Sequence, residues 1–242
     1  MKSLMNASLL VLVLACTNSA LAEDAPHQTE TEALSGIIRN LVHDNAQFVR
    51  SHKPAYFKPF MDSQNPRATV VTCADSRVHE SAWDKSADGD LFVVRNIGNQ
   101  LETAEGSIEY GVHHLHTPLL IFVGHSACGA IKAASGDYST LSAPIRKELD
   151  TIHINKGTEN MAGVEANVHN QVQSAIKKFQ TEVDKGDLTV MGAVYDFRNE
   201  LKKGQGQLVI INMNGESDAA KVKKQLASIL PAGTPAIQKH HH

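Results

Sequence analysis

The sequence lacks a long apolar run, lacks an excess of basic residues, and contains only three cysteines. The apolar stretch near the N-terminus, Leu9 to Ala15, is far shorter than the ~20 residues of a membrane-spanning helix, which excludes such an anchor there. The net charge of −3 at pH 7 gives no electrostatic support for a nucleic-acid or anionic-membrane partner. The sequence shows no internal repeat, and 242 residues with 42% hydrophobic content suit one globular domain with a sizeable core.

The first 22 residues have the pattern of a secretory signal peptide. Lys2 supplies the positive end, and Ala20-Leu21-Ala22 supplies the small-residue cleavage site. We expect residues 1–22 to be removed, which predicts a periplasmic or secreted protein. Lipoprotein processing at Cys16 is an alternative, and it is the one route by which we expect attachment to a membrane.

The rest of the chain is expected to form a single domain at residues 23–235, and His240 to His242 resemble the remnant of a purification tag. Apolar residues at helical spacing predict helices at Ala33 to Val49, Ala104 to His116 and Val164 to Val183. Short apolar runs predict strands at Ala68 to Thr72, Leu91 to Val94, Leu119 to Val123, Leu188 to Val194 and Leu208 to Ile211. This order predicts an α/β fold, with a central, mostly parallel β-sheet flanked by helices and ligands beyond the carboxyl ends of the strands.

Two short motifs hold both cysteines that follow the predicted leader, and each comes directly after a predicted strand. They are Cys73-Ala74-Asp75-Ser76-Arg77 and His125-Ser126-Ala127-Cys128. An oxidising compartment favours a disulfide between two thiols. The three-residue spacing of His125 and Cys128 instead favours a shared zinc ion, for which Cys, His and Asp are suitable ligands.

These motifs, with Val93-Val94-Arg95-Asn96-Ile97-Gly98-Asn99 between them, resemble the β-class carbonic anhydrases. The resemblance runs from about Ala33 to about Leu230 and is closest to an exported bacterial member with a plant-like pattern. It implies the β-carbonic anhydrase fold and reversible hydration of CO2 to bicarbonate and a proton by a zinc-bound hydroxide. CO2 and bicarbonate would be the small-molecule partners.

The resemblance also implies a role for each motif residue. Cys73, His125 and Cys128 would be the Zn²⁺ ligands and would leave a fourth position open for water. Asp75 would pair with Arg77 in the active form, and in a closed form it would become the fourth ligand. The family's regulatory bicarbonate site uses a Trp at the position of Val70, so we expect the Asp75–Arg77 pair to stay intact in this chain.

A substrate pocket and a proton relay follow from the same resemblance. The neighbouring subunit would contribute Phe92, Ile97 and Tyr110, which implies a homodimer or a higher homo-oligomer, although ordinary core positions would also explain these three residues. Gln64 and the backbone N–H of Gly129 would donate to substrate oxygen. Tyr110 and His114, four residues apart on one helix, would carry the proton.

Two other functions are compatible with these residues. One is a hydrolase on the same scaffold that acts on a CO2-like molecule such as carbon disulfide. The other is a non-catalytic zinc-binding or redox protein that uses the same thiols. Asp75 and Arg77 beside the ligands disfavour the second of these, because a structural zinc site has four protein ligands and needs no acidic residue next to them.

Overall fold

The computed structural model describes residues 29–230. The predicted signal peptide, Cys16 and the histidines at the end of the chain lie outside these residues. The chain separates into two compact units, Met1–Tyr56 and Phe57–His242. Within residues 29–230, no helix combines the length and the apolar character needed to cross a bilayer.

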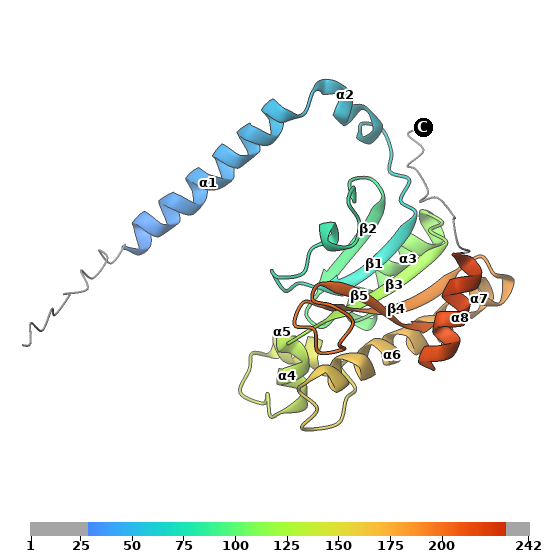
Figure 1. Cartoon of the computed structure of the whole chain (residues 1–242). Helices are drawn as coiled ribbons and strands as arrows, with labels where there is room; N and C mark the ends of the chain where they lie inside the picture. The colour runs from blue at the N-terminus through green and yellow to red at the C-terminus, as the bar shows by residue number, and fades with distance from the viewer. Residues whose placement is uncertain (1–28, 231–242) are drawn as a thin grey trace, which may run out of the picture. The chain divides into compact units, whose positions relative to one another are not determined.

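Seventeen helical and strand segments follow one another along the described residues (Figure 1). In chain order they are α1 (Glu30–Ser51), α2 (Pro54–Phe57), η1 (Lys58–Phe60), β1 (Ala68–Cys73), η2 (Glu80–Ala82), β2 (Leu91–Asn96), η3 (Glu102–Ala104), α3 (Glu105–Glu109), η4 (Tyr110–His114), β3 (Leu119–His125), α4 (Gly129–Ser135), α5 (Ala143–Leu149), α6 (Met161–Lys178), α7 (Gln180–Lys185), β4 (Thr189–Asp196), β5 (Gln207–Met213) and α8 (Ala219–Ile229). The five strands and helices α1 and α6 occur where the sequence predicts them, whereas α4, α5 and α8 were not predicted.

The first unit consists mainly of α1, a helix of 22 residues. A capping box starts it, in which the Thr29 side chain accepts from the Glu32 N–H and the Glu32 carboxylate accepts from the Thr29 N–H. One side of the helix carries large apolar side chains that remain exposed, among them Leu34, Leu41 and Val42. The helix is therefore amphipathic, and its apolar side is exposed to solvent among the described residues.

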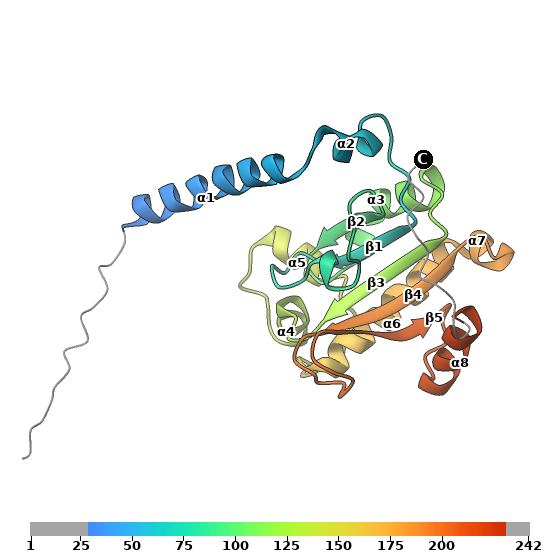
Figure 2. The ribbon, with the colours of Figure 1, turned by 45° about the horizontal axis from the view of Figure 1, so that its top comes forward.

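The second unit is built on a five-stranded sheet with the order β2-β1-β3-β4-β5 (Figure 2). All neighbouring strands are parallel except β4 and β5, which are antiparallel. The predicted mostly parallel sheet is thus confirmed. Every residue of β1 is buried, as expected for an apolar strand in the middle of a parallel sheet.

Glycines let α6 pack closely on the sheet. A Cβ atom at Gly192 in β4 would lie 2.7 Å from Val168 Cγ1, and one at Gly124 in β3 would lie 2.7 Å from Val168 Cγ2. Only glycine allows this approach. Val172 and Phe179 continue the contact into a core that also contains residues of β1 and β3.

Two predicted helices are wrong in detail. The segment Val164 to Val183 is divided at Phe179, where a non-helical backbone places the fully buried ring in the core and separates α6 from α7. The segment Ala104 to His116 is divided into η3, α3 and the π-helical turn η4, in which the Leu115 N–H donates to the Tyr110 carbonyl. The break at Phe179 and the π-helical turn cannot be predicted from the spacing of apolar residues, because the buried side chains keep nearly the same spacing on both sides of each.

Candidate metal centre

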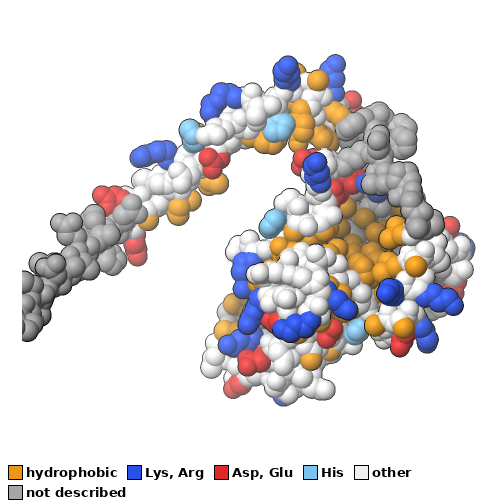
Figure 3. All heavy atoms as spheres, in the orientation of Figure 1, with side chains coloured by type: hydrophobic (Ala, Val, Ile, Leu, Met, Phe, Trp, Pro, Cys, Tyr) orange, Lys and Arg blue, Asp and Glu red, His pale blue; other side chains and the backbone are white. Residues whose placement is uncertain are grey.

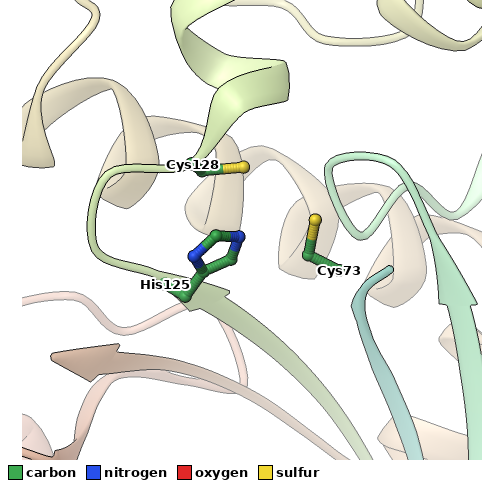
Figure 4. A group of neighbouring side chains, drawn as sticks. All are labelled: Cys73, His125 and Cys128. Carbon is green, nitrogen blue, oxygen red and sulfur yellow. The ribbon is translucent and has the colours of Figure 1, made fainter. Parts of the chain in front are cut away.

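The three predicted zinc ligands converge at the carboxyl ends of two neighbouring strands. Cys73 is the last residue of β1, His125 is the last residue of β3, and Cys128 directly precedes α4. Their ligand atoms lie within 4.8 Å of one another, and all three side chains are buried. Figure 4 shows both sulfur atoms and the imidazole pointing toward a common centre.

The topology of the sheet explains why these strand ends form a site. The chain passes from β1 to β2 on one side and then to β3 on the other side of β1. At such a reversal the connections leave in opposite directions, and a crevice opens at the carboxyl ends of the two strands. Cys73 and His125 lie at the edges of this crevice.

The imidazole of His125 is oriented for metal binding. Its Nδ1 lies 3.0 Å from the carbonyl oxygen of Ser126, so Nδ1 carries the proton and donates it. Nε2 is buried and has no hydrogen-bond partner within the described residues. A buried unpaired nitrogen is costly, and a metal ion at the centre would satisfy its lone pair.

The two neighbouring thiols shift each other's pKa in opposite directions. Hydrogen bonding with the neighbouring Cys128 thiol is the main cause that lowers the pKa of Cys73, to about 4. The same bond and burial raise the pKa of Cys128. Both cysteines are free thiols, so the disulfide that the sequence left open is not formed. The site therefore presents two cysteine sulfurs and one imidazole nitrogen, a donor set that fits Zn²⁺.

Asp75 and Arg77 form a two-point salt bridge beside these ligands. The Arg77 Nε donates to Asp75 Oδ1 at 2.9 Å, and an Nη atom donates to Oδ2 at 2.6 Å. This guanidinium holds the pKa of Asp75 well below its usual range. Asp75 Oδ2 is also 3.9 Å from His125 Nε2, the nitrogen that faces the centre.

Arg95 holds the loop that carries Asp75. Its guanidinium donates to the backbone carbonyls of Cys73, Asp75 and Val78, the first at 2.9 Å and the second at 3.0 Å. A further Nη atom lies 3.3 Å from the Glu80 carboxylate. The loop between β1 and η2 is thereby tied to the neighbouring strand β2.

Two of the predicted pocket positions lie near the ligands. Ile97 packs against the core that contains Cys73 and Cys128, and Gly129 is the first residue of α4, directly after Cys128. The backbone at Gly129 has open space around it, since a Cβ atom there would meet nothing within 4 Å. Ile97, which the resemblance assigned to the neighbouring subunit, thus lies beside the ligands of its own chain.

The remaining predicted residues lie toward the other end of the strands. Phe92 pairs with Thr69 near the start of β1, and its ring is 5.8 Å from that of Tyr110. The rings of Tyr110 and His114 are 4.4 Å apart, as expected for one helix face. Gln64 is exposed and precedes β1. In a single chain these four residues are not brought to the metal centre.

Two residues that the sequence analysis did not select fix the loop between the ligands. The Ser126 hydroxyl donates to the buried Asp196 carboxylate at 2.7 Å, and the same carboxylate accepts from the backbone N–H of Leu201 at 2.7 Å. Burial raises the pKa of Asp196, but these hydrogen bonds outweigh burial and keep its pKa below the usual value. Asp196 follows the predicted strand Leu188 to Val194, and this place beyond a strand end was the feature of the sequence by which it could have been selected.

A buried amide network supports the segment between the two motifs. The Gln100 side chain donates to the Gly98 carbonyl and, at 2.9 Å, to Asn167 Oδ1 of α6. Gln171 donates to Gln100 Oε1 at 2.7 Å. These contacts hold the turn after β2. Amides scattered through the sequence gave no motif from which this network could be predicted.

Comparison with known proteins agrees with this arrangement. The family model described as carbonic anhydrase matches residues 68–204. A carbonic anhydrase of Synechococcus elongatus is 37% identical over 103 residues, which are 40% of this chain and only 38% of that protein. A carbonic anhydrase of Emericella nidulans is 30% identical over 185 residues, which are 67% of this chain and 81% of that protein.

Solved structures show the same fold. A tetrameric β-carbonic anhydrase from Sordaria macrospora superposes with a TM-score of 0.60 at 22% identity, covering 75% of this chain and 98% of that chain. The family model spans more than half of this chain, and the Emericella relative is matched over most of its length. The chain therefore belongs to the carbonic anhydrase family and has the fold of the β class.

Proposed function

We propose that this chain is a zinc-dependent carbonic anhydrase that interconverts CO2 and bicarbonate. The observation that carries the proposal is the buried cluster of Cys73, His125 and Cys128 with a carboxylate beside it. Three protein ligands and a nearby acidic group are typical of catalytic zinc sites, whereas structural sites have four ligands.

The residues present fit a zinc ion in number, type and orientation. Sulfur and imidazole nitrogen are the ligands zinc prefers, and the free Nε2 of His125 already faces the centre. When bound, zinc supplies Lewis acidity that brings the pKa of water near neutrality and so provides a nucleophile at physiological pH.

Asp75 and Arg77 would orient the reacting groups. Because Arg77 keeps the Asp75 carboxylate ionised, this carboxylate can accept a hydrogen bond from the nucleophile at Oδ2. The carbonyl of Ala127 also accepts from Arg77 at 3.1 Å, which fixes the guanidinium against the ligand loop. The backbone N–H of Gly129 is the candidate donor to substrate oxygen at the start of α4.

Stopped-flow CO2 hydration separates the possible functions. We expect rapid hydration that is lost after treatment with a zinc chelator and restored by added zinc. Turnover of carbon disulfide without turnover of CO2 would favour the hydrolase. Zinc binding without either activity would favour a non-catalytic protein and would contradict the proposal.

We also propose that the chain works as a homodimer or a larger homo-oligomer. Apolar side chains gather in a hollow over the strands of the sheet, and they also follow one side of α1 (Figure 3). On the sheet, Met191, Leu208 and Ile210 are only half-buried although they join the apolar cluster. Apolar surface of this kind favours contact with another protein surface, and the Sordaria macrospora relative is tetrameric.

Light scattering after size-exclusion chromatography tests the assembly. We expect a mass of at least two chains for the wild type and a shift toward one chain for Leu208→Glu. Ile229→Glu, which places the same charge on the exposed side of α8, serves as the matched control. A wild-type mass of one chain would contradict the proposed assembly and leave the CO2 assay to judge the activity.

We propose export as well, on the evidence of the N-terminal sequence pattern. Expression in a bacterium followed by fractionation should place the protein in the periplasm or medium, with a mature N-terminus at Glu23. Recovery of a lipid-modified chain that Cys16→Ser abolishes would instead support lipoprotein processing. A full-length chain retained in the cytoplasm would contradict export.

A further inference from the structure

The ring of Phe197 lies beside both Arg77 and the metal ligand His125. It follows the end of β4, and the Arg77 Cζ atom is 5.1 Å from the centre of its ring. The imidazole of His125 stacks on it with ring centroids 6.1 Å apart and an angle of 25° between the planes. The sequence motifs give no reason to select this residue.

Arg77 needs such support because it is exposed. About half of its side chain, 49%, is accessible to solvent, and exposed ion pairs are weak and readily opened. An aromatic face attracts a guanidinium through the ring quadrupole and restricts where the flat group can lie. Phe197 therefore opposes the swing of Arg77 away from Asp75.

The consequence for Asp75 follows from its two neighbours. Its Oδ2 atom is 2.6 Å from an Arg77 Nη atom and 3.9 Å from His125 Nε2. Carboxylate oxygen is an accepted zinc ligand. If the Asp75 carboxylate lost Arg77, it would be the carboxylate beside the three ligands that could join them in holding zinc.

The protein holds Phe197 itself in place. The ring makes an edge contact with Tyr195 at 5.7 Å, and Tyr195 makes another with Trp83 at 5.6 Å. The preceding residue, Asp196, is fully buried and hydrogen-bonded to Ser126. The ring is thus carried by a fixed strand end and two further aromatic side chains.

We propose that Phe197 is a positioning residue that holds Arg77 on Asp75 and so keeps the Asp75 carboxylate away from the metal. The proposal rests on the proposed zinc site, but not on CO2 turnover. The rate at which the Asp75–Arg77 pair opens measures the effect of Phe197 directly.

Hydrogen exchange of the Arg77 Nε–H measures this opening, because the Nε–H donates to Asp75 while the pair is closed. We expect Phe197→Leu, which keeps apolar bulk but removes the ring, to speed this exchange about two- to five-fold in the zinc-loaded protein. Phe197→Tyr should behave as wild type. Tyr138→Leu removes the ring that lies 5.0 Å from Lys156 Nζ, and it is the matched control with no expected effect.

The rate at which zinc is released to a chelator shows whether Phe197 holds Arg77 or instead holds the metal ligand His125. We expect release to be slower in Arg77→Gln, because Asp75 is then free to serve as a further ligand, and not faster in Phe197→Leu than in wild type. The proposal would be overturned if Phe197→Leu released zinc faster than wild type or left the Arg77 Nε–H exchange unchanged. It would also be overturned if Phe197→Leu and Phe197→Tyr exchanged at the same rate. Neither readout depends on CO2 hydration, so its failure is distinguishable from failure of the proposed activity.

Discussion

Two groups of predicted site residues lie at opposite ends of the same strands. Cys73 and His125 end β1 and β3 and are buried, whereas Phe92 pairs with Thr69 near the start of β1. Thr69 and Cys73 are four residues apart, which corresponds to about 13 Å along a strand. Tyr110, which contacts Phe92, is 43% exposed, while His125 is fully buried.

The difference between the two groups shows which part of the predicted site a single chain can form by itself. The three metal ligands converge within one chain, and a backbone carbonyl orients the imidazole of His125. The group around Phe92 and Tyr110 has no part of the metal centre near it. If both groups serve one reaction, a second copy of the chain has to bring them together, which agrees with the proposed homo-oligomer.

Removing a metal ligand should have the largest effect. We expect His125→Ala to lose bound zinc and to lower CO2 hydration by at least about 10³-fold, because two thiol ligands alone hold zinc poorly. Metal analysis and stopped-flow kinetics measure both changes. The exposed His116 provides the control substitution, His116→Ala, and full zinc content in His125→Ala would show that the metal lies elsewhere.

Neutralising Asp75 should affect the reaction and spare the metal. We expect Asp75→Asn to keep zinc but to lower kcat about 10²- to 10³-fold, because the amide cannot act as the charged acceptor beside the nucleophile. The exposed Asp137, replaced in the same way, is the control. Unchanged kcat in Asp75→Asn would remove Asp75 from the site and leave the metal centre intact.

Asp196→Asn should weaken the loop between the ligands. We expect a loss of about 1–3 kcal/mol in the free energy of unfolding. The carboxylate accepts a hydrogen bond from the Leu201 N–H, and an amide nitrogen in its place would put two donors face to face. Since the pKa of Asp196 is lowered in the folded state, its contribution is present above the unfolded pKa of about 3.9 and is lost as pH falls through the folded pKa. Denaturant unfolding at pH 7 and below pH 4 should therefore show the difference from wild type shrinking in acid.

His114→Ala should have the smallest effect, on the second group alone. We expect a roughly ten-fold lower kcat in weak buffer, with recovery on adding imidazole, if His114 and Tyr110 relay protons. His113, whose Nε2 is 3.0 Å from the Glu182 carboxylate, is the control. Turnover of His114→Ala that is independent of buffer would remove the relay role.

The metal ligands could be predicted from the sequence because residues of the right chemistry also stand at the ends of predicted strands. Cys73 and His125 each end an apolar run, and carboxyl ends of adjacent parallel strands meet in space whatever the intervening loops do. The strands themselves were predictable for the same reason, since buried β-branched runs leave few alternatives.

The sequence was insufficient where contacts depend on the course of the backbone. Asp196 and Phe197 meet the site only because β4 lies beside β3 in one register. The break at Phe179 and the π-helical turn at Tyr110 arise from packing against the sheet, which periodicity does not record.

The central claim is that the two groups form one active site across two copies of the chain. Cys73→Ala and Gln64→Ala, each of which we expect to be inactive or strongly impaired, should be co-expressed so that mixed oligomers form. Random pairing of a two-fold dimer then predicts recovery of about a quarter of wild-type CO2 hydration. Co-expression of Cys73→Ala with His125→Ala, two lesions in the same group, should recover nothing. Activity of the first mixture no higher than the sum of its parts would contradict the claim.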